Sequence, residues 1–299
     1  MTDLPGLSTR FGATDRIAFE ASPLGGPVVR LTHGPQQVLV ALHGAHVLNW
    51  TAGGEGLLWL SPVARIKAGK GIRGGIPVCW PWFGDHATDA SKPAHGFVRQ
   101  RAWEVIAATA SVDAVVLTLA QATGAADRAA WPHQAEARLT VTLGAGLALA
   151  LETHNTGQAL FPLTQALHTY FRVSDIAKVQ VTGLDGRAYL DKLEGFGRKV
   201  QAGGIGFERE LDRIYLGDTS AIELVDRSAK RTMRIASTGS RSAVVWNPWI
   251  EKTARLGDMG SAQAYAQMLC IETANAGDDV VTLAPGARHV LGASYSVVR

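Results

Sequence analysis

The sequence predicts an all-β protein, a large antiparallel β-sandwich with few short helices. Runs of about five to eight β-forming residues, broken by Gly, Asn or Asp turns, recur from end to end. Helical periodicity is nearly absent: 251–259 suits a short helix and 125–131 a single turn. Because no linker, composition shift or internal repeat divides the chain, we expect one domain over residues 1–299, formed by stacked antiparallel sheets.

The clearest strand signals lie in the middle of the chain. Residues 114–120 (AVVLTLA) are followed by 137–143 (ARLTVTL), and the turn Gly144-Ala145-Gly146 then leads into 147–153. A short Gly-containing connection between two alternating runs is typical of a β-hairpin. These residues therefore predict a hairpin within a longer meander.

Two further hairpins are predicted in the C-terminal part. Residues 221–226 and 232–236 flank a polar segment, which suits an exposed turn between paired strands. Residues 280–283 and 289–298 are separated by Pro285-Gly286, a dipeptide that favours a turn. We expect each pair to form an antiparallel hairpin.

The composition indicates a globular protein with a small-molecule partner. Hydrophobic residues make up 46% of the chain and charged residues 18%, which suits a large buried core. The net charge is only +3, without a run of five like charges, so we expect no nucleic-acid or membrane partner. With no signal peptide and no apolar stretch near ~20 residues, a cytoplasmic protein is expected. We also expect a monomer. The two cysteines, Cys79 and Cys270, are predicted to be free buried thiols.

Two motif-like patterns do not carry the chemistry that they suggest. Residues 69–74 (GKGIRG), with Asp89 further on, fit a dinucleotide-binding pattern, but 76–81 carry two prolines where its helix would run. His43 and His46 are spaced like metal ligands, yet an odd separation on a strand places them on opposite faces. We interpret both patterns as structural.

A polar and aromatic loop is the first candidate site segment. Residues 73–84 combine two prolines, three glycines and three large aromatics, and 95–99, which add Gly96, follow shortly after them. Such a segment predicts a rigid loop whose exposed aromatic faces stack on a sugar. Packing on the core would explain the aromatic residues but leaves Arg73, His95 and Arg99 without a role.

Three later segments add titratable groups. His168 stands in a strand-like run beside aromatic residues, where a lone histidine is more often a core residue than a functional one. Asp212 precedes Arg213, and a surface ion pair between them is the simple interpretation. Glu272 follows four mostly apolar residues, and a carboxylate is costly to bury there unless its pKa is tuned for proton transfer.

Together these segments resemble a known family. GGIPVCWPWFG, HGFVR, ALHTYF, LDRIY, VWNPW and IETANA occur in this order within residues 73–275. The ordered set is similar to the glucose-6-phosphate 1-epimerase (hexose-6-phosphate mutarotase) branch of the aldose 1-epimerase superfamily. The resemblance implies a galactose mutarotase-like supersandwich that interconverts the α and β anomers of a phosphorylated sugar, with no metal and no cofactor.

The resemblance also implies a role for each site residue. His168 is expected to be the general acid toward the ring oxygen, and Glu272 the base on the anomeric hydroxyl. Some relatives have Gln before the His-Gly pair, whereas this chain has Ala94, which cannot supply the side-chain contact of that Gln. The implied ligands are Arg73 and Arg99 for the phosphate, and His95 and Asp212 for sugar oxygens.

The chemistry of ring opening accounts for these residue types. A hemiacetal opens when one group removes the proton of the anomeric hydroxyl and another protonates the ring oxygen. Three alternatives remain open: an epimerase of unphosphorylated aldoses, a non-catalytic carbohydrate-binding or regulatory module, and a glycoside hydrolase. The hydrolase would use two carboxylates, such as Asp212 and Glu272, and could dispense with His168.

Overall fold

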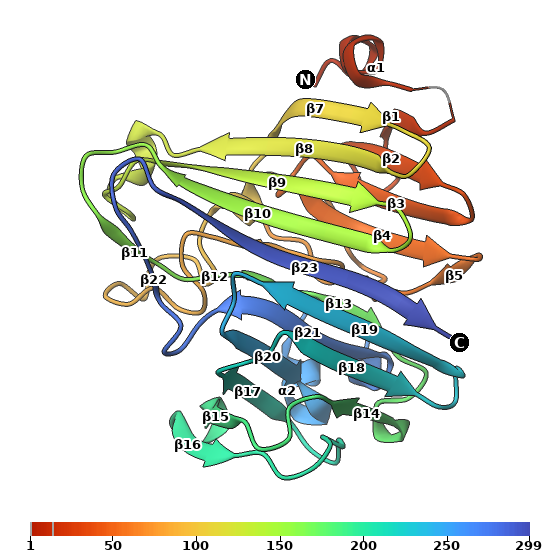
Figure 1. The fold of residues 1–299 in the computed structure, drawn as a ribbon, viewed down its shortest axis with the longest axis vertical. Helices are drawn as coiled ribbons and strands as arrows, with labels where there is room; N and C mark the ends of the chain where they lie inside the picture. The colour runs from red at the N-terminus through yellow and green to blue at the C-terminus, as the bar shows by residue number, and fades with distance from the viewer. Residues whose placement is uncertain (1, 14) are drawn as a thin grey trace.

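The computed structural model describes residues 2–13 and 15–299, and its strands form two large sheets, a smaller sheet and a short ribbon (Figure 1). The first large sheet, called the outer sheet, is antiparallel and lies across the front of Figure 1. Its strands, in spatial order, are β14 (Val179–Thr182), β18 (Ala221–Asp226), β19 (Arg231–Thr238), β23 (Arg288–Val298), β10 (Leu147–Asn155), β9 (Ala135–Leu143), β8 (Val115–Ala122) and β7 (Glu104–Ala110).

The second large sheet, called the site sheet, packs behind the outer sheet. A short additional strand, β13 (Tyr170–Arg172), also pairs with its central strand β21. The main strands, in spatial order, are β16 (Gly197–Val200), β15 (Ala188–Asp191), β17 (Leu211–Leu216), β20 (Ser242–Asn247), β21 (Met268–Asn275), β12 (Gln165–Leu167) and β6 (Val78–Cys79).

The remaining elements are short. The longer helices are α1 (Leu4–Phe11) and α2 (Trp249–Arg255). The smaller sheet and the ribbon consist of β1 (Ile17–Ala21), β2 (Pro27–His33), β3 (Gln36–Ala41), β4 (His46–Ala52) and β5 (Glu55–Gly56), with β11 (Phe161–Leu163) pairing β22 (Val281–Leu283). The 3-10 helices are η1 (Val98–Gln100), η2 (Ala125–Asp127), η3 (Ile176–Lys178), η4 (Lys192–Glu194) and η5 (Ala264–Gln267).

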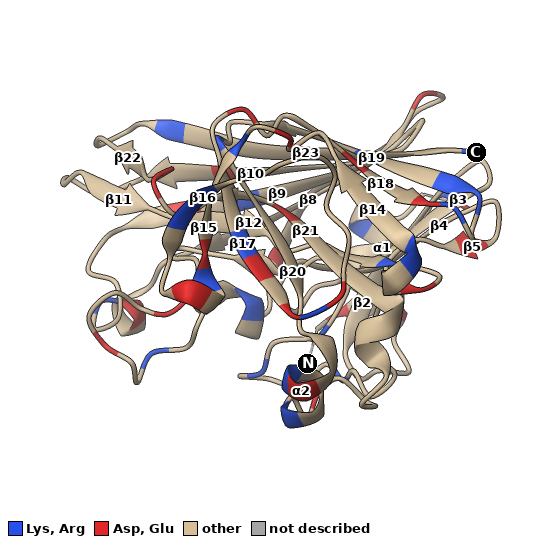
Figure 2. Ribbon diagram, turned by 90° about the horizontal axis from the view of Figure 1, so that it is seen from below, with Lys and Arg blue, Asp and Glu red and all other residues tan. Residues whose placement is uncertain are grey.

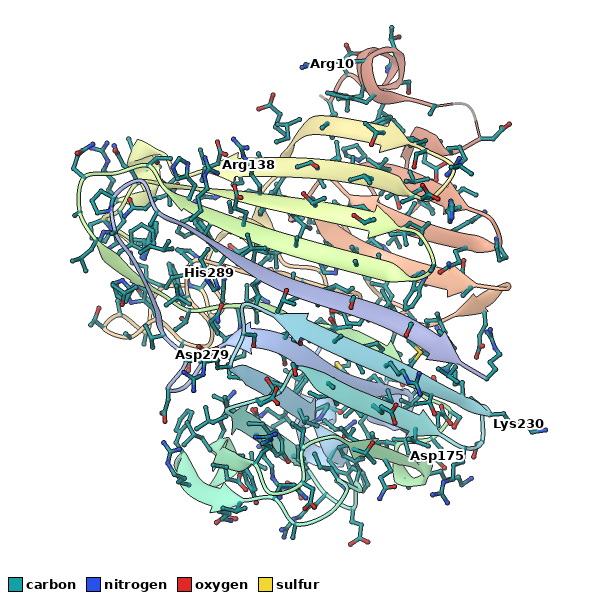
Figure 3. The ribbon with its side chains drawn as sticks, in the orientation of Figure 1. Arg10, Arg138, Asp175, Lys230, Asp279 and His289 are labelled. Carbon is teal, nitrogen blue, oxygen red and sulfur yellow. The ribbon has the colours of Figure 1, made fainter. Side chains whose placement is uncertain are left out.

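Strict alternation in the outer sheet produces the sandwich. In β9 and β10 every second residue is buried, because successive side chains of a strand point to opposite faces. The inward residues, such as Leu139, Val141 and Leu149, belong to the main core. Figure 3 shows side chains such as Arg138 on the opposite face of these strands, away from the core.

The central strands β20 and β21 of the site sheet are buried on both faces, and the two faces differ in what they contact. Leu269 and Ile271 of β21 belong to the main core, and Thr273 hydrogen-bonds Ser237 of β19 (Oγ1 to Oγ, 2.8 Å). Cys270 belongs to a second apolar cluster on the other face. Because Glu272 is two residues further along the strand, it lies on that second face, directed away from the outer sheet.

The predicted β-sandwich is confirmed, with one error among the predicted hairpins. Strands β8, β9 and β10 form the meander, and β18 pairs with β19 as expected. The third hairpin is wrong: β22 pairs with β11, whereas β23 runs between β10 and β19. Pro285-Gly286 therefore connects two separate sheets, a choice of partner that local turn chemistry does not determine.

The helices differ from the sequence prediction in detail. The predicted helix at 251–259 corresponds to the shorter α2, and the predicted turn at 125–131 contains η2. Helix α1 was not anticipated. Its N-cap, Asp3, accepts a hydrogen bond from the Gly6 N–H (3.0 Å), which satisfies one of the free donors in the first turn.

Candidate active site

The structure brings His168 and Glu272 into direct contact. His168 lies between β12 and β13, and its Nε2 is 3.3 Å from Oε1 of Glu272 on β21. The His168 backbone N–H donates to the Pro77 carbonyl (3.0 Å), which fixes the residue beside the edge strand β6. Their side chains are 10% and 1% exposed, so the pair is almost fully removed from water.

Burial shifts the proton affinities of this pair in opposite directions. Burial, assisted by the nearby His95 and Arg73, holds the pKa of His168 well below its ordinary value of 6.5. Burial likewise raises the pKa of Glu272 well above 4.5; the charge of Lys192 opposes this rise and that of Asp212 adds to it. Because the two pKa values shift in opposite directions, Glu272 holds a proton more strongly, and His168 less strongly, than in water, so either group can carry the proton that the pair exchanges.

Aromatic rings surround the imidazole of His168. Tyr170 stacks on it with ring centroids 4.8 Å apart and planes within 10° of parallel. His95 and Trp246 approach edge-on, at 5.5 Å and 6.1 Å. Tyr170 and Trp246 lie within the motifs ALHTYF and VWNPW, but the sequence analysis gave neither of them a role.

The predicted exposed aromatic loop is wrong in part. Trp80 is fully buried and donates from Nε1 to Thr153 Oγ1 (2.9 Å), and Trp82 is also buried. Phe83 is partly exposed and packs against His95 with ring centroids 5.0 Å apart. The two tryptophans therefore anchor the loop to the core, because their large apolar surfaces are better removed from water.

Asp212 lies on the same face as Glu272, on strand β17, and its partner differs from the simple prediction. It pairs with Lys192 of η4 (Oδ2 to Nζ, 3.0 Å), whereas Arg213 points to the other face and contacts Asp191 (3.7 Å). The alternation of side chains along a strand separates Asp212 from its sequence neighbour. Burial raises the pKa of Asp212, although Lys192 opposes the shift.

Arg73 approaches the pair through Tyr170. Its Nη1 donates to the Tyr170 hydroxyl (2.9 Å), and its Nη2 pairs with Asp258 Oδ2 (3.0 Å). The two glycines that follow it allow a close approach of the backbone. A Cβ on Gly74 would lie 2.6 Å from Leu60 Cα, and φ is positive at both Gly74 and Gly75, a conformation that favours glycine.

His95 and Arg99 come from the neighbouring turn. His95 adopts a left-handed conformation (φ 64°), its backbone N–H donates to the Gly84 carbonyl (2.7 Å), and its Nδ1 accepts from the Gly84 N–H (3.2 Å). Burial, together with Arg99, lowers the pKa of His95 to about 3, so the ring is neutral near pH 7. Arg99 donates from Nη2 to the Ala94 carbonyl (2.9 Å), so position 94 contributes its backbone to this cluster.

Unpartnered buried polar atoms concentrate in this region. Buried polar groups are nearly always hydrogen-bonded, so each exception needs an explanation. Among the described residues only ten buried side-chain atoms lack a partner, and five of the six predicted site residues contribute one each. The five atoms are Arg73 Nε, Arg99 Nε, His168 Nδ1, Asp212 Oδ1 and Glu272 Oε2.

One group of side chains could hold a metal ion by geometry. Ligand atoms of His168, Cys270 and Glu272 lie within 4.8 Å of one another. Burial raises the pKa of the Cys270 thiol well above 9.0, and it also favours a protonated Glu272. A cation would have to displace both protons near the positive charges of Arg73 and Arg99, which makes this donor set a poor metal site.

Comparison with known proteins agrees with this fold. The fold and the similar sequences place this protein in the class of epimerase and mutarotase enzymes. The chain is a member of the aldose 1-epimerase family, whose model matches residues 27–296. Within the described parts of the chain, no helix is both long and apolar enough to cross a membrane.

Relatives in this family include proteins with a more specific, provisional name. A Cenchrus ciliaris protein provisionally named glucose-6-phosphate 1-epimerase is 40% identical over 83% of this chain and 77% of its own. An Escherichia coli protein with the same provisional name is 36% identical over 84% of each chain. A crystal structure from Salmonella typhimurium, provisionally named a mutarotase, has a TM-score of 0.88 at 30% identity, covering 97% of this chain and 96% of its own.

Proposed function

We propose that this enzyme interconverts the α and β anomers of hexose 6-phosphates, with glucose 6-phosphate as the preferred substrate, through acid-base opening and closure of the ring. The observation that carries the proposal is the contact of His168 with Glu272 on the face of the site sheet that is directed away from the outer sheet. An acid and a base in contact can address two neighbouring oxygens of one molecule. The anomeric oxygen and the ring oxygen are such neighbours, since both are bonded to C1.

The proposed reaction moves two protons without a net change in charge. Glu272 accepts the proton of the anomeric hydroxyl while His168 donates a proton to the ring oxygen, and the bond from C1 to the ring oxygen breaks. The resulting aldehyde rotates about the C1–C2 bond. Ring closure then reverses both transfers, with His168 as the base and Glu272 as the acid, and gives the other anomer.

The phosphate of the substrate is assigned to Arg73 and Arg99. Guanidinium groups bind planar or tetrahedral oxyanions through paired N–H donors. Each arginine has an Nε without a partner, and the charges of both reach His168. His95 and Asp212 are assigned to sugar hydroxyls, and the free Oδ1 of Asp212 supports this assignment.

Removal of either arginine is expected to act on the charged substrate alone. Arg73→Ala or Arg99→Ala should raise KM for glucose 6-phosphate by about 10-fold or more, because a charge-assisted hydrogen bond contributes about 1.5–3 kcal/mol. KM for free glucose should change little. Steady-state kinetics with both sugars checks this, and equal effects on both would contradict the phosphate assignment and favour an epimerase of unphosphorylated aldoses.

The pH dependence of kcat/KM should reflect the coupled titration of His168 and Glu272. The active form holds one proton, so kcat/KM should fall at acid pH when a second proton binds and at alkaline pH when the last one leaves. Because the pKa of His168 is lowered, the acid limb should lie below 6.5; because that of Glu272 is raised, the alkaline limb should lie above 4.5. Asp212→Asn should move the alkaline limb down and Lys192→Met should move it up, since these charges act oppositely on Glu272. Shifts in the same direction would contradict the assignment.

Exchange NMR on freshly dissolved α-glucose 6-phosphate, with and without protein, tests the function directly. We expect the protein to accelerate α-to-β exchange above the spontaneous rate. Binding without acceleration would indicate a carbohydrate-binding or regulatory module. Hydrolysis of a glycoside that survives loss of His168 would indicate a glycoside hydrolase.

The proposal extends to the state and setting of the protein. We treat residues 1–299 as one domain, supported by β23, which joins β10 and β19 in one continuous sheet. We propose a monomer in the cytoplasm that binds a phosphorylated sugar and no nucleic acid. The net charge of only +3 supports the last point, and in Figure 2 blue Lys and Arg segments are interspersed with red Asp and Glu segments along the ribbon.

A further inference from the structure

We propose that Asp258 is a specificity-determining residue that occupies the phosphate-binding face of Arg73 and leaves it when a dianionic phosphate binds. The inference deepens the proposed function and depends on its assignment of the phosphate to Arg73. Nothing in the sequence pattern pointed to Asp258, which lies just after α2. Its contact with Arg73 arises only in the folded chain.

The donors of Arg73 are already partly used in the free protein. Nη1 donates to Tyr170, Nη2 pairs with Asp258 at 3.0 Å, and Nε is buried without a partner. A guanidinium binds a phosphate best through two parallel N–H donors. Nε and Nη2 form one such edge, so a phosphate can use it only if the Asp258 carboxylate gives up Nη2.

The two existing partners of Arg73 differ in how easily they can leave. Tyr170 is 2% exposed, and its ring lies between Trp59 (5.9 Å) and His168 (4.8 Å), so it is held in place. The Asp258 side chain is 54% exposed and hydrogen-bonds no other described residue. Asp258 is therefore the partner that a ligand can displace.

Displacement of the carboxylate does not require the backbone to move. The Asp258 carbonyl accepts a hydrogen bond from Ser61 Oγ (2.7 Å), and the next residue, Met259, is fully buried. Gly260 packs tightly on Pro62, where a Cβ would lie 2.6 Å from the proline Cγ. With the backbone held at Asp258 and at the two residues that follow it, a rotation of the Asp258 side chain into solvent is enough to free Nη2.

Exchange of one anion for another gives selectivity by charge. A sugar phosphate carries close to two negative charges near neutral pH, whereas the Asp258 carboxylate carries one. The exchange is thus favourable for a dianion and nearly neutral for a monoanion, which gains little by replacing one carboxylate with another. A neutral sugar leaves the Arg73–Asp258 pair intact.

Isothermal titration with inorganic phosphate tests the inference without requiring catalysis. Asp258→Asn removes the charge but keeps an oxygen that can accept from Nη2, so the orientation of Arg73 is preserved. We expect its phosphate Kd to fall by about two- to fivefold, the range for a solvent-accessible ion pair, and its acetate affinity to rise by at least the same factor. The matched control, Glu223→Gln, breaks the Arg234–Glu223 pair (2.9 Å) on the outer sheet and should change neither Kd.

The possible outcomes separate this inference from the proposed function. If the wild type binds phosphate through Arg73 but Asp258→Asn binds it equally well or more weakly, Asp258 only positions Arg73 and the inference is wrong. If neither the wild type nor Asp258→Asn binds phosphate, the phosphate assignment fails and the inference fails with it. If the Asp258→Asn variant does not fold, the phosphate and acetate affinities of Asp258→Ser, measured in parallel, provide the same test.

Discussion

Glu272→Gln is expected to lower kcat for anomer interconversion of glucose 6-phosphate by about 10²- to 10⁴-fold, the usual contribution of a general base. Glutamine keeps the shape of the side chain but cannot accept the proton of the anomeric hydroxyl. Because burial disfavours the charged carboxylate, the variant should unfold at a temperature equal to or higher than that of the wild type. Exchange NMR measures the rate, and thermal unfolding measures the stability.

A matched control for Glu272 is available on the outer sheet. Glu152→Gln makes the same chemical change on β10, where the side chain pairs with Arg288 on the surface, and it should leave kcat unaltered. Rates for Glu272→Gln within a factor of about three of the wild type would remove this residue from the mechanism, since even weak general-base catalysis contributes more than that.

His168→Asn should reduce kcat by a similar factor of about 10²- to 10⁴-fold, because the ring oxygen loses its proton donor. The asparagine side chain can still occupy the space beside Glu272, so KM should change less than kcat. In the double variant with Glu272→Gln the two losses should not add fully, since the residues act on one substrate as a unit. Single-turnover exchange measurements on all three variants check this.

The histidine control also lies on the outer sheet. His154 on β10 is partly exposed, and the His154→Asn variant should retain full activity. A fully active His168→Asn enzyme that stops working on loss of Asp212 and Glu272 would favour two-carboxylate chemistry instead. Full additivity of the two single losses would indicate that the residues act in separate steps.

The fold was predictable where one strand face is buried and the other is exposed. Strands β9 and β10 alternate through nine residues each, so their type and pairing follow from the sequence. Strand β21 is buried throughout; its partner β12 lies far away along the chain, and α2 and η5 separate it from its other partner, β20. Partner choice between distant strands is a tertiary property, which explains the wrong hairpin at β22 and β23.

The candidate site was predictable in its titratable groups but not in their partners. His168 and Glu272 could be found from family motifs, whereas Lys192 and Asp258 lie in segments without any such pattern. Lys192 is partly buried and Asp258 is exposed, and the roles of both arise from ion pairs that form only in the folded chain. The same limit applies to Trp80 and Trp82, because composition alone does not distinguish a stacking platform from a core anchor.

Two hydroxyl pairs connect the segments that carry the proposed acid and base to strands of the outer sheet. Thr169, next to His168, bonds the Tyr295 hydroxyl (2.7 Å), and Thr273, next to Glu272, bonds Ser237. The residue next to each proposed catalytic side chain is thus bonded across the interior, Thr169 to β23 and Thr273 to β19. The spacing of the His168 imidazole and the Glu272 carboxylate therefore depends on how the two sheets pack. Substitutions in β19 or β23 are expected to change that spacing, and with it the rate, although neither strand carries a proposed substrate-binding residue.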